Sequence, residues 1–232
     1  MPVPIGRSES QPDLSELTIG VLGGTGPQGR GLAYRWAVAG LSVLIGSRDA
    51  GRADLAAAAL RERSGSDRVR GADNVGCAAE SDLVLVAVPF DGHAPLLESL
   101  RQPLAAKTVI DCVNPLGFDQ FGPYVKPVPE GSAAQQAQAL LPESRVTAAF
   151  HHVSAVLLDD PEVSTLDTDV LVLGDDREAT DLVRALADAI PGIRGRYGGR
   201  LRNAGQVEAL AANLIAINKR YKAHAGIRIT DV

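Results

Sequence analysis

Three glycines near the start of the chain have a spacing that can do chemistry. Gly24, Gly26 and Gly29 form the pattern Gly-x-Gly-x-x-Gly directly after the apolar residues 17–22. Between a strand and a helix this pattern is typical of a dinucleotide site: the first glycine permits a tight turn, the second lets the backbone approach a pyrophosphate, and the third lets the helix pack on the strand. The free N–H groups of the helix start can then bind phosphate. A tight turn without a ligand is the alternative.

The residues after the second predicted strand indicate which dinucleotide is bound. Ser47 and Arg48 stand where an NAD site carries the Asp or Glu that binds the ribose 2′-hydroxyl. A carboxylate would repel a 2′-phosphate, whereas a guanidinium pairs with phosphate oxygens. Arg52 lies four residues after Arg48, so both face one phosphate if a helix begins between them. The pattern favours NADP, and solvated surface arginines are the alternative.

Two further strand ends are expected to line the same crevice. Val88 and Pro89 follow a strongly apolar strand, and Asn114 follows the next strand along the chain. In an open parallel sheet, ligands bind outside the carboxyl ends of the strands. These residues are therefore expected on the ribose and nicotinamide side of the crevice, although a proline there can also simply end a strand.

The elements that must position these residues alternate between strand and helix. Apolar runs predict strands at residues 17–22, 41–46, 69–71, 81–88, 108–113, 145–150 and 170–174. Helical periodicity and caps predict helices at residues 28–39, 51–63, 74–80, 91–104, 132–141, 175–189 and 203–221. The alternation predicts an α/β fold of the Rossmann type, a doubly wound parallel sheet with right-handed crossovers.

The rest of the chain lacks this alternation. Residues 117–130 are rich in Gly, Pro and aromatics and are expected to form a loop at the mouth of the site, and residues 151–160 are expected to be irregular. No sheet strand is predicted after the last helix, which is expected to form a small C-terminal helical lobe that covers the crevice or pairs with another subunit. The predicted division is a flexible leader at 1–16, a dinucleotide-binding domain at 17–157 and the C-terminal lobe at 158–232.

Composition and charge exclude several classes of protein. The 232-residue chain is 45% apolar, enough for a sizeable core, and its net charge of −5 argues against a nucleic-acid platform. No apolar run reaches the roughly 20 residues of a membrane span, and the polar start has no signal-peptide core. Cys77 and Cys112 are too few for a disulfide framework and suit a reducing cytosol. They form no Cys-x-x-Cys pair, and His151-His152 has no partner at metal-ligand spacing, so no metal site is predicted.

Taken together, these motifs resemble those of the coenzyme F420-dependent NADP oxidoreductases. In the front half the matching segments are Gly-Gly-Thr-Gly at 23–26, Ile-Gly-Ser-Arg at 45–48 with Arg52, and Val-Pro-Phe at 88–90. Many NADP-binding reductases share that half. The specific segments come later, and they are Phe-His-His-Val-Ser-Ala at 150–155, Leu-Gly-Asp-Asp at 173–176 and Arg-Tyr-Lys-Ala-His-Ala-Gly-Ile at 220–227. The resemblance covers nearly everything after the leader.

The resemblance implies a cytoplasmic homodimer that transfers a hydride reversibly between NADP(H) and coenzyme F420, an 8-hydroxy-5-deazaflavin that serves as co-substrate. It also implies NADP contacts from Thr25, Gly26, Pro27, Gln28, Ser47, Arg48, Arg52, Val88, Asn114 and Ala155. Pro27-Gln28 departs from the Asn-Leu that other members often have. Because proline has no N–H, one phosphate donor at the helix start is absent.

Two groups of side chains are candidates for the deazaflavin side. His152, with the backbone of residues 153–155, either has a structural role or lines the ring-stacking pocket and stabilises charge at the pyrimidine edge of the deazaflavin. Four basic residues near the C-terminus either attract the acidic tail of the deazaflavin or only complement the helix dipole; they are Lys219, Arg220, Lys222 and Arg228.

Two other functions remain open for the sequence. An NADP-dependent imine or hydroxyacid reductase would share the front half, but it needs an acid to protonate its product, often from a helical C-terminal domain longer than the one expected here. A redox sensor would bind NADP without turnover and regulate a partner. Hydride transfer from NADPH to the oxidised deazaflavin separates these three functions.

Overall fold

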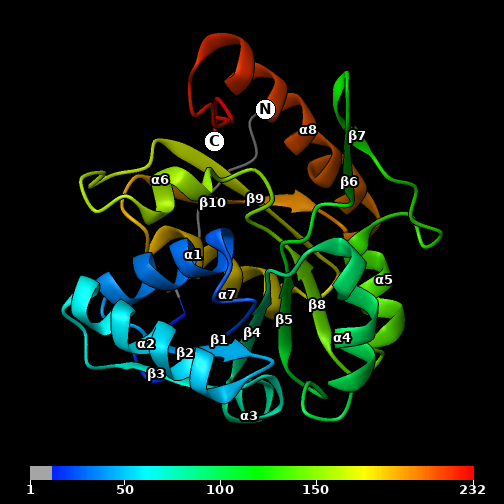
Figure 1. Cartoon of the computed structure of the whole chain (residues 1–232). Helices are drawn as coiled ribbons and strands as arrows, with labels where there is room; N and C mark the ends of the chain where they lie inside the picture. Colours follow the sequence, from blue (N-terminus) through cyan, green and yellow to red (C-terminus); the bar gives the residue numbers. More distant parts are fainter. Residues whose placement is uncertain (1–11) are drawn as a thin grey trace, which may run out of the picture.

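An eight-stranded sheet runs through the molecule in the order β10-β9-β8-β5-β4-β1-β2-β3 (Figure 1). The computed structural model describes residues 12–232, so residues 1–11 of the expected leader lie outside it. The strands are β1 (Thr18–Leu22), β2 (Ser42–Ser47), β3 (Val69–Asp73), β4 (Leu83–Val86), β5 (Thr108–Asp111), β8 (Arg145–Ala148), β9 (Thr168–Gly174) and β10 (Ile193–Gly199). The six from β3 to β8 are parallel, with the Rossmann strand order, which confirms the predicted fold class.

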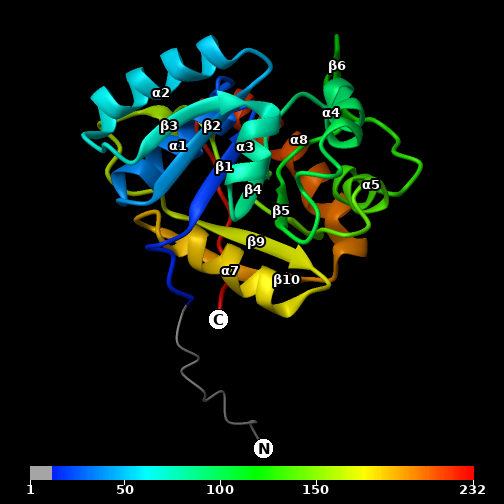
Figure 2. The same ribbon diagram turned by 90° about the horizontal axis from the view of Figure 1, so that it is seen from below.

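Helices cover both faces of the sheet (Figure 2). They are α1 (Pro27–Val38), α2 (Ala50–Ser64), α3 (Asn74–Glu80), α4 (His93–Ser99), α5 (Ala133–Leu140), α6 (Ala155–Asp159), α7 (Arg177–Asp188) and α8 (Ala204–Tyr221), with 3-10 turns η1 (Phe90–Gly92) and η2 (Leu201–Asn203) before α4 and α8. In β4, Leu83 and Leu85 pack with residues of α1, α2 and α7, whereas Val84 and Val86 pack with residues of α3, α4 and α5. Both faces are buried, which explains the continuous apolar run of this strand.

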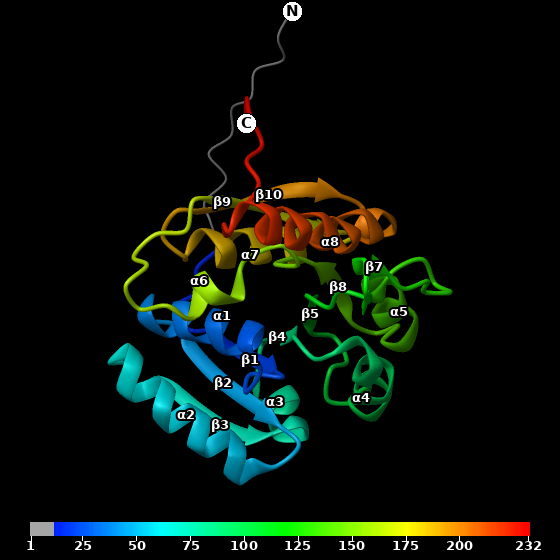
Figure 3. The same cartoon turned by 45° about the horizontal axis from the view of Figure 1, so that its top comes forward.

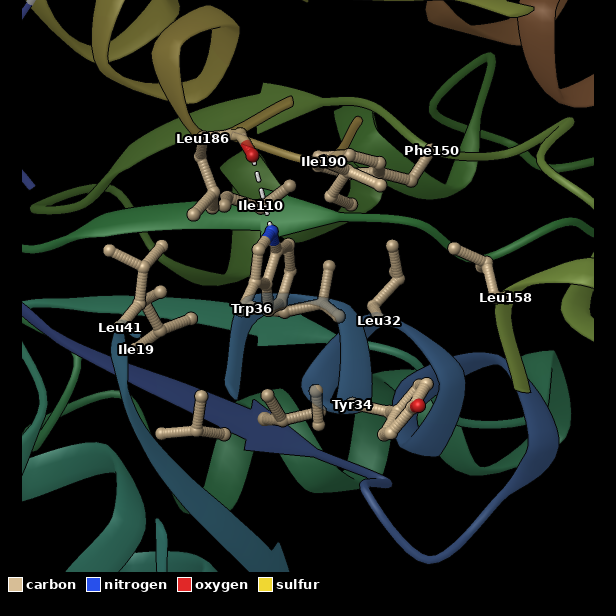
Figure 4. Packing of buried hydrophobic residues seen from close by; sticks show 14 of the residues in the cluster. Ile19, Leu32, Tyr34, Trp36, Leu41, Ile110, Phe150, Leu158, Leu186 and Ile190 are labelled. Carbon is tan, nitrogen blue, oxygen red and sulfur yellow. Dashed lines mark hydrogen bonds between the residues drawn. The ribbon is translucent and has the colours of Figure 1, made fainter. Parts of the chain in front are cut away.

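Trp36 of α1 anchors one face of the core. Its Nε1 donates a hydrogen bond to the carbonyl oxygen of Leu186 on α7 at 3.2 Å, and its ring meets Phe150 edge-on with the ring centroids 5.7 Å apart (Figure 4). Phe150 is fully buried just beyond β8 and has a left-handed backbone with φ of 66°. The helix that follows the glycine-rich turn is thereby fixed against the segment that leaves β8.

Three segments differ from the sequence predictions. The helix expected at 91–104 ends at Ser99, because Pro103 has no N–H to donate and disfavours a helical backbone at the residue before it. The loop expected at 117–130 contains an antiparallel hairpin of β6 (Leu116–Asp119) and β7 (Gly122–Val125), which the Gly-rich and Pro-containing sequence conceals. The segment expected to be irregular at 151–160 contains α6, whose N-cap Ser154 accepts a hydrogen bond from the Leu157 N–H.

The C-terminal part of the chain adds a strand that the sequence analysis did not predict. β10 pairs in parallel with β9, and β9 pairs antiparallel with β8, so both strands extend the main sheet (Figure 3). Three glycines interrupt the apolar pattern of β10, which explains why the sequence does not predict this strand. One of them, Gly195, is required, because a Cβ there would lie 2.6 Å from the Arg184 carbonyl oxygen of α7. The helical end of the chain, α8, packs beside α5 and the hairpin, and the division at residue 158 stays a prediction.

A buried carboxylate fastens the chain beyond α8 to the start of β9. Asp169 accepts hydrogen bonds from Arg194 at 2.6 and 2.8 Å, from Arg228 at 2.8 Å and from the Ile229 N–H at 2.6 Å. The bond from Arg194 is the main reason that the pKa of Asp169 lies below its ordinary value. Arg228 also pairs with Asp167, so this guanidinium is engaged within its own chain.

Candidate functional site

A cavity of about 610 Å³ opens at the carboxyl ends of β1, β2, β3 and β4. Its walls bring together Thr25 and Gly26 from the first turn, Ser47, Arg48 and Arg52 from the second strand end, and Val88 and Pro89 after β4. Seven of the predicted cofactor residues therefore line the same cavity. It is also lined by residues that the sequence analysis did not single out, namely Gly23, Gly46, Asn74, Val75, Ala87, Gly92, Pro95, Leu96, Ser99 and Leu100.

The glycine-rich turn is held in a compact form by its own backbone. Gly23 has a left-handed φ of 84°, and a Cβ there would lie 2.4 Å from the Ala87 carbonyl oxygen, so only glycine fits. A Cβ on Gly29 would lie 2.7 Å from the Gly23 carbonyl oxygen, which shows how closely α1 approaches the turn. Gly24 and Gly29 act as scaffold behind the cavity rather than in its wall. Pro27 is the first residue of α1, where a missing N–H costs no helical hydrogen bond.

The two arginines after β2 are free to meet an anion. The α2 helix begins between them, as expected, because Asp49 is its N-cap and accepts a hydrogen bond from the Arg52 N–H at 2.7 Å. Within residues 12–232 neither Arg48 nor Arg52 forms an ion pair with a carboxylate. Ser47 is buried beside them at the end of β2. Two unpaired guanidiniums and a hydroxyl at this strand end suit a phosphate monoester.

The remaining predicted residues lie outside the wall of this cavity. Gln28 donates through Nε2 to the Phe150 carbonyl oxygen at 3.2 Å, and Asn114 donates through Nδ2 to the His151 carbonyl oxygen at 2.8 Å. Both amides thus hold the segment that follows β8. Ala155 lies apart from them, in a shallower cavity of about 290 Å³ between the starts of α1 and α6.

Buried polar atoms without a partner gather at the ends of β5 and β8. Asn114 Oδ1 and all four ring nitrogens of His151 and His152 have no hydrogen-bond partner within the described chain. Burial lowers the pKa of each histidine to about 4, so both imidazoles are neutral at neutral pH. A bound group with hydrogen-bonding edges would satisfy such atoms, which makes this segment a candidate for the second part of the site.

Buried polar side chains from α4, β5 and α8 lie around the start of α5. His93 Nε2 donates to Asp111 Oδ2 at 2.6 Å, and its Nδ1 lies 3.1 Å from Gln136 Oε1 on α5. Burial opposes protonation of His93, but the hydrogen bond and charge of Asp111 outweigh it and raise the pKa of His93. Glu208 of α8 accepts from the N–H groups of Ala133 and Ala134 at the start of α5, and burial raises the pKa of Glu208 to about 7.

Other candidate chemistries have less support in the described part of the chain. Residues 12–232 contain no group of three His, Cys, Asp or Glu side chains placed to hold a metal ion. Burial raises the pKa of the Cys77 thiol to about 12 and also raises that of Cys112, so neither is a ready nucleophile. Among the helices of residues 12–232, none combines the length and the apolar character that crossing a bilayer requires.

The cavity fits a dinucleotide that carries an extra phosphate. The start of α1 offers backbone N–H groups without a helical partner, the end of β2 offers two unpaired guanidiniums, and Asn74 Oδ1 is a buried acceptor without a partner in the described chain. These donor and acceptor sets correspond to a pyrophosphate, a 2′-phosphate and a base. Asn74 was missed by the sequence analysis, and the available signal was its position directly after the third parallel strand.

The comparisons with known proteins agree with this geometry. Residues 18–115 match the family model described as NADP oxidoreductase, coenzyme F420-dependent. The F420-dependent NADP reductase of Methanothermobacter thermautotrophicus is 42% identical over 93% of this chain and 96% of its own, and that of Methanocaldococcus jannaschii is 35% identical over 93% and 99%. A crystal structure from Arthrobacter sp. FB24, described as a candidate F420-dependent NADP reductase, is 28% identical with a TM-score of 0.77 over 92% of this chain and 99% of its own. The chain belongs to the family of coenzyme F420-dependent NADP oxidoreductases.

Proposed function

We propose that this protein transfers a hydride reversibly between NADP(H) and coenzyme F420. The observation that carries the NADP part is the pair of guanidiniums, Arg48 and Arg52, unpaired within the described chain and facing one cavity at the end of β2. The coenzyme F420 part is supported by the relatives, which are named F420-dependent NADP reductases and match nearly the whole chain. The protein is then an NADPH-dependent reductase of F420.

In this proposal the chain binds the adenosine half of NADP(H) in the large cavity. The turn that lines the cavity at Gly23, Thr25 and Gly26 meets the pyrophosphate, and the start of α1 adds N–H donors, although Pro27 supplies none. Thr25 and the Ser47 hydroxyl donate hydrogen bonds, and the two arginines hold the 2′-phosphate. Val88 and Pro89, which line the same cavity, contact the ribose.

The nicotinamide end is proposed to lie toward the segment after β8. Gln28 and Asn114 hold that segment, so Asn114 Oδ1 and the neutral His152 ring remain available to a bound ring. Ala155 is proposed to contact the cofactor from the start of α6. The bound cofactors supply the hydride chemistry themselves. The residues of the chain bring the two rings into contact and keep water away from them.

The C-terminal segment, residues 158–232, is proposed to contribute to the deazaflavin side. Arg228 is engaged by Asp167 and Asp169, so it does not serve the acidic tail of the deazaflavin. Lys219, Arg220 and Lys222 remain, all exposed near the end of α8. Their attraction for an acidic tail competes with the alternative that they only complement the negative end of the helix dipole.

A homodimer in the cytoplasm is also proposed. Large apolar side chains are exposed on α8 and on the adjacent hairpin, including Tyr221 at 73%, Ile217 at 39% and Phe121 at 89% exposure. A second copy of the chain would cover such a surface. The two buried free thiols suit a reducing compartment. Sedimentation equilibrium of the purified protein measures the oligomeric state, and a monomer at micromolar concentration would contradict the dimer.

One assay tests the reaction against its rivals. The purified protein is mixed with NADPH and oxidised coenzyme F420, and the absorbance of each chromophore is followed. Equal molar losses of both are expected. Binding of NADPH without turnover would favour a redox sensor, and turnover only with an imine or a keto acid would favour the other class of reductase. Either result would overturn the proposed function.

A further inference from the structure

The large cavity has a third region that the phosphate groups of a dinucleotide do not use. Asn74 and Val75 line it from the end of β3, and Pro95, Leu96 and Leu100 line it from α4. Val75 is an apolar side chain that is 54% exposed, and Pro95, Leu96 and Leu100 of the same lining are apolar as well. An apolar part of a cavity suits a flat aromatic ring, and the only such ring at this end of a dinucleotide is its base.

A single polar atom in this region has no partner in the described chain. Asn74 Oδ1 is buried and accepts no hydrogen bond from residues 12–232. The strand register places Asp73 beside Ser47, so Asn74 follows directly after the residue level with the proposed phosphate site. A buried acceptor left unpaired destabilises the protein, whereas a ligand that offers an N–H group there recovers the lost hydrogen bond.

The chemistry of this atom distinguishes the possible ligand groups. A phosphate offers only acceptor oxygens at neutral pH, so it does not match the Asn74 carbonyl oxygen, and Arg48 and Arg52 already suit it. Adenine presents an exocyclic N–H₂ donor beside the N7 acceptor, and the side-chain amide of asparagine matches both at once. Guanine or hypoxanthine presents two acceptors at the same edge, and the amide can satisfy only one of them.

We propose that the Asn74 amide recognises the adenine base of the cofactor through its N6–N7 edge, with the ring held between Val75 and α4. This inference rests on the proposed function, because it places NADP(H) in the large cavity. It makes Asn74 a residue that determines base specificity, separate from the arginines that determine specificity for the 2′-phosphate.

Binding, measured by nicotinamide fluorescence without coenzyme F420, tests the inference. The Kd is determined for NADPH and for the analogue that carries hypoxanthine in place of adenine. The wild type is expected to prefer adenine about tenfold, as one bidentate pair provides. Asn74→Leu, which keeps the shape of the side chain, and Asn74→Ala are both expected to bind NADPH about tenfold more weakly and to lose the preference.

Two matched controls separate this inference from the proposed function. Ser99 lines the same cavity but donates its hydroxyl to the Leu96 carbonyl oxygen, so Ser99→Ala should keep the base preference. Arg48→Ala should lower the preference for NADPH over NADH and keep the base preference. If Arg48→Ala acts in this way but both Asn74 variants still prefer adenine, only the inference about Asn74 is overturned. If Arg48→Ala leaves the preference for NADPH unchanged, the placement of the cofactor fails, and the inference fails with it.

Discussion

At the scale of single residues, the end of β2 is where we propose that the choice of cofactor is made. Arg48 and Arg52 line the cavity without an ion-pair partner in the described chain, while most arginines elsewhere in the structure pair with carboxylates or bind backbone carbonyls. A guanidinium that is not already neutralised loses less on meeting a phosphate, because no internal ion pair has to break first. Both guanidiniums can therefore bind an anion without first breaking an ion pair in the described chain.

The first prediction concerns these two unpaired arginines. Replacing both Arg48 and Arg52 with alanine should raise the KM for NADPH by about 100-fold or more, since two charge-assisted hydrogen bonds are lost and each contributes about 1.5–3 kcal/mol. Weak use of NADH should change little, because NADH has no 2′-phosphate. Steady-state kinetics with both cofactors measure the effect, and equal losses with NADPH and NADH would contradict it.

His152 gives the second prediction. Its pKa in the folded protein is about 4, below the ordinary 6.5, because burial disfavours the charged imidazolium. The unfolded chain therefore takes up more protons, and the free energy of unfolding falls as the pH drops from 6.5 to 4. His152→Gln should reduce that fall by up to about 3 kcal/mol. Urea unfolding at pH 7 and pH 4.5 measures it, and a variant with the wild-type pH dependence would refute it.

At the scale of elements, the strands that are buried on both faces were the most predictable. β1, β2, β4 and β5 appear in the sequence as apolar runs because helices cover each side of them. β10 was missed because its glycines serve the close approach of α7, a tertiary reason that a local pattern does not carry. The hairpin was missed because two strands of four residues, containing Gly122 and Pro123, have the composition of a loop.

The site was predictable to the same extent as these elements. The turn before α1 and the end of β2 have fixed places in a Rossmann unit, so spacing alone predicted that Gly26, Ser47 and Arg48 would lie at one cavity. Asn74 was missed because it follows a strand whose sequence, Val-Arg-Gly-Ala-Asp, gives only a weak signal. The contacts of Gln28 and Asn114 with the segment after β8 join residues more than 30 positions apart, which no local pattern reveals.

The third prediction concerns the contact between α8 and α5. Burial raises the pKa of Glu208 to about 7, above its ordinary 4.5, so the folded protein holds this proton more tightly than the unfolded chain. The free energy of unfolding therefore falls as the pH rises from 4.5 to 7, opposite in sign to the effect of His152. Glu208→Gln still offers an acceptor to the start of α5 and should remove this fall, up to about 3 kcal/mol. Unfolding curves at both pH values decide it, and an unaltered fall would count against it.

At the scale of the whole molecule, the C-terminal segment extends the sheet and then packs back against it. β9 and β10 extend the sheet beyond β8, α8 then passes beside α5, and the tail returns to the start of β9 (Figure 3). Asp169 holds this return with two arginines and one backbone N–H. This buried carboxylate is the only acceptor that joins Arg194, Arg228 and the Ile229 N–H within residues 12–232, and further bonds such as that from the Ile227 N–H to Thr168 Oγ1 support the attachment.

The fourth prediction tests this attachment. Asp169→Asn should lower the free energy of unfolding by about 1–3 kcal/mol, because it leaves two partly exposed guanidiniums without their charge partner. Hydrogen exchange of residues 225–232 should also accelerate. Asp167→Asn is the matched control, because this carboxylate also pairs with Arg228 but its side chain is 85% exposed, and it should cost less than about 1 kcal/mol. Equal effects of the two variants would rule out the special role of Asp169.

The double attachment of α8 has a consequence for how a ligand would meet it. Its first turns are joined to α5 through Glu208, and the chain beyond its last turn is clasped at Asp169, so no free end remains to swing as a hinge. The helix is held at both ends in the folded chain. Its ordering entropy is already lost when the chain folds, which leaves a smaller entropic cost for any molecule that later binds against it.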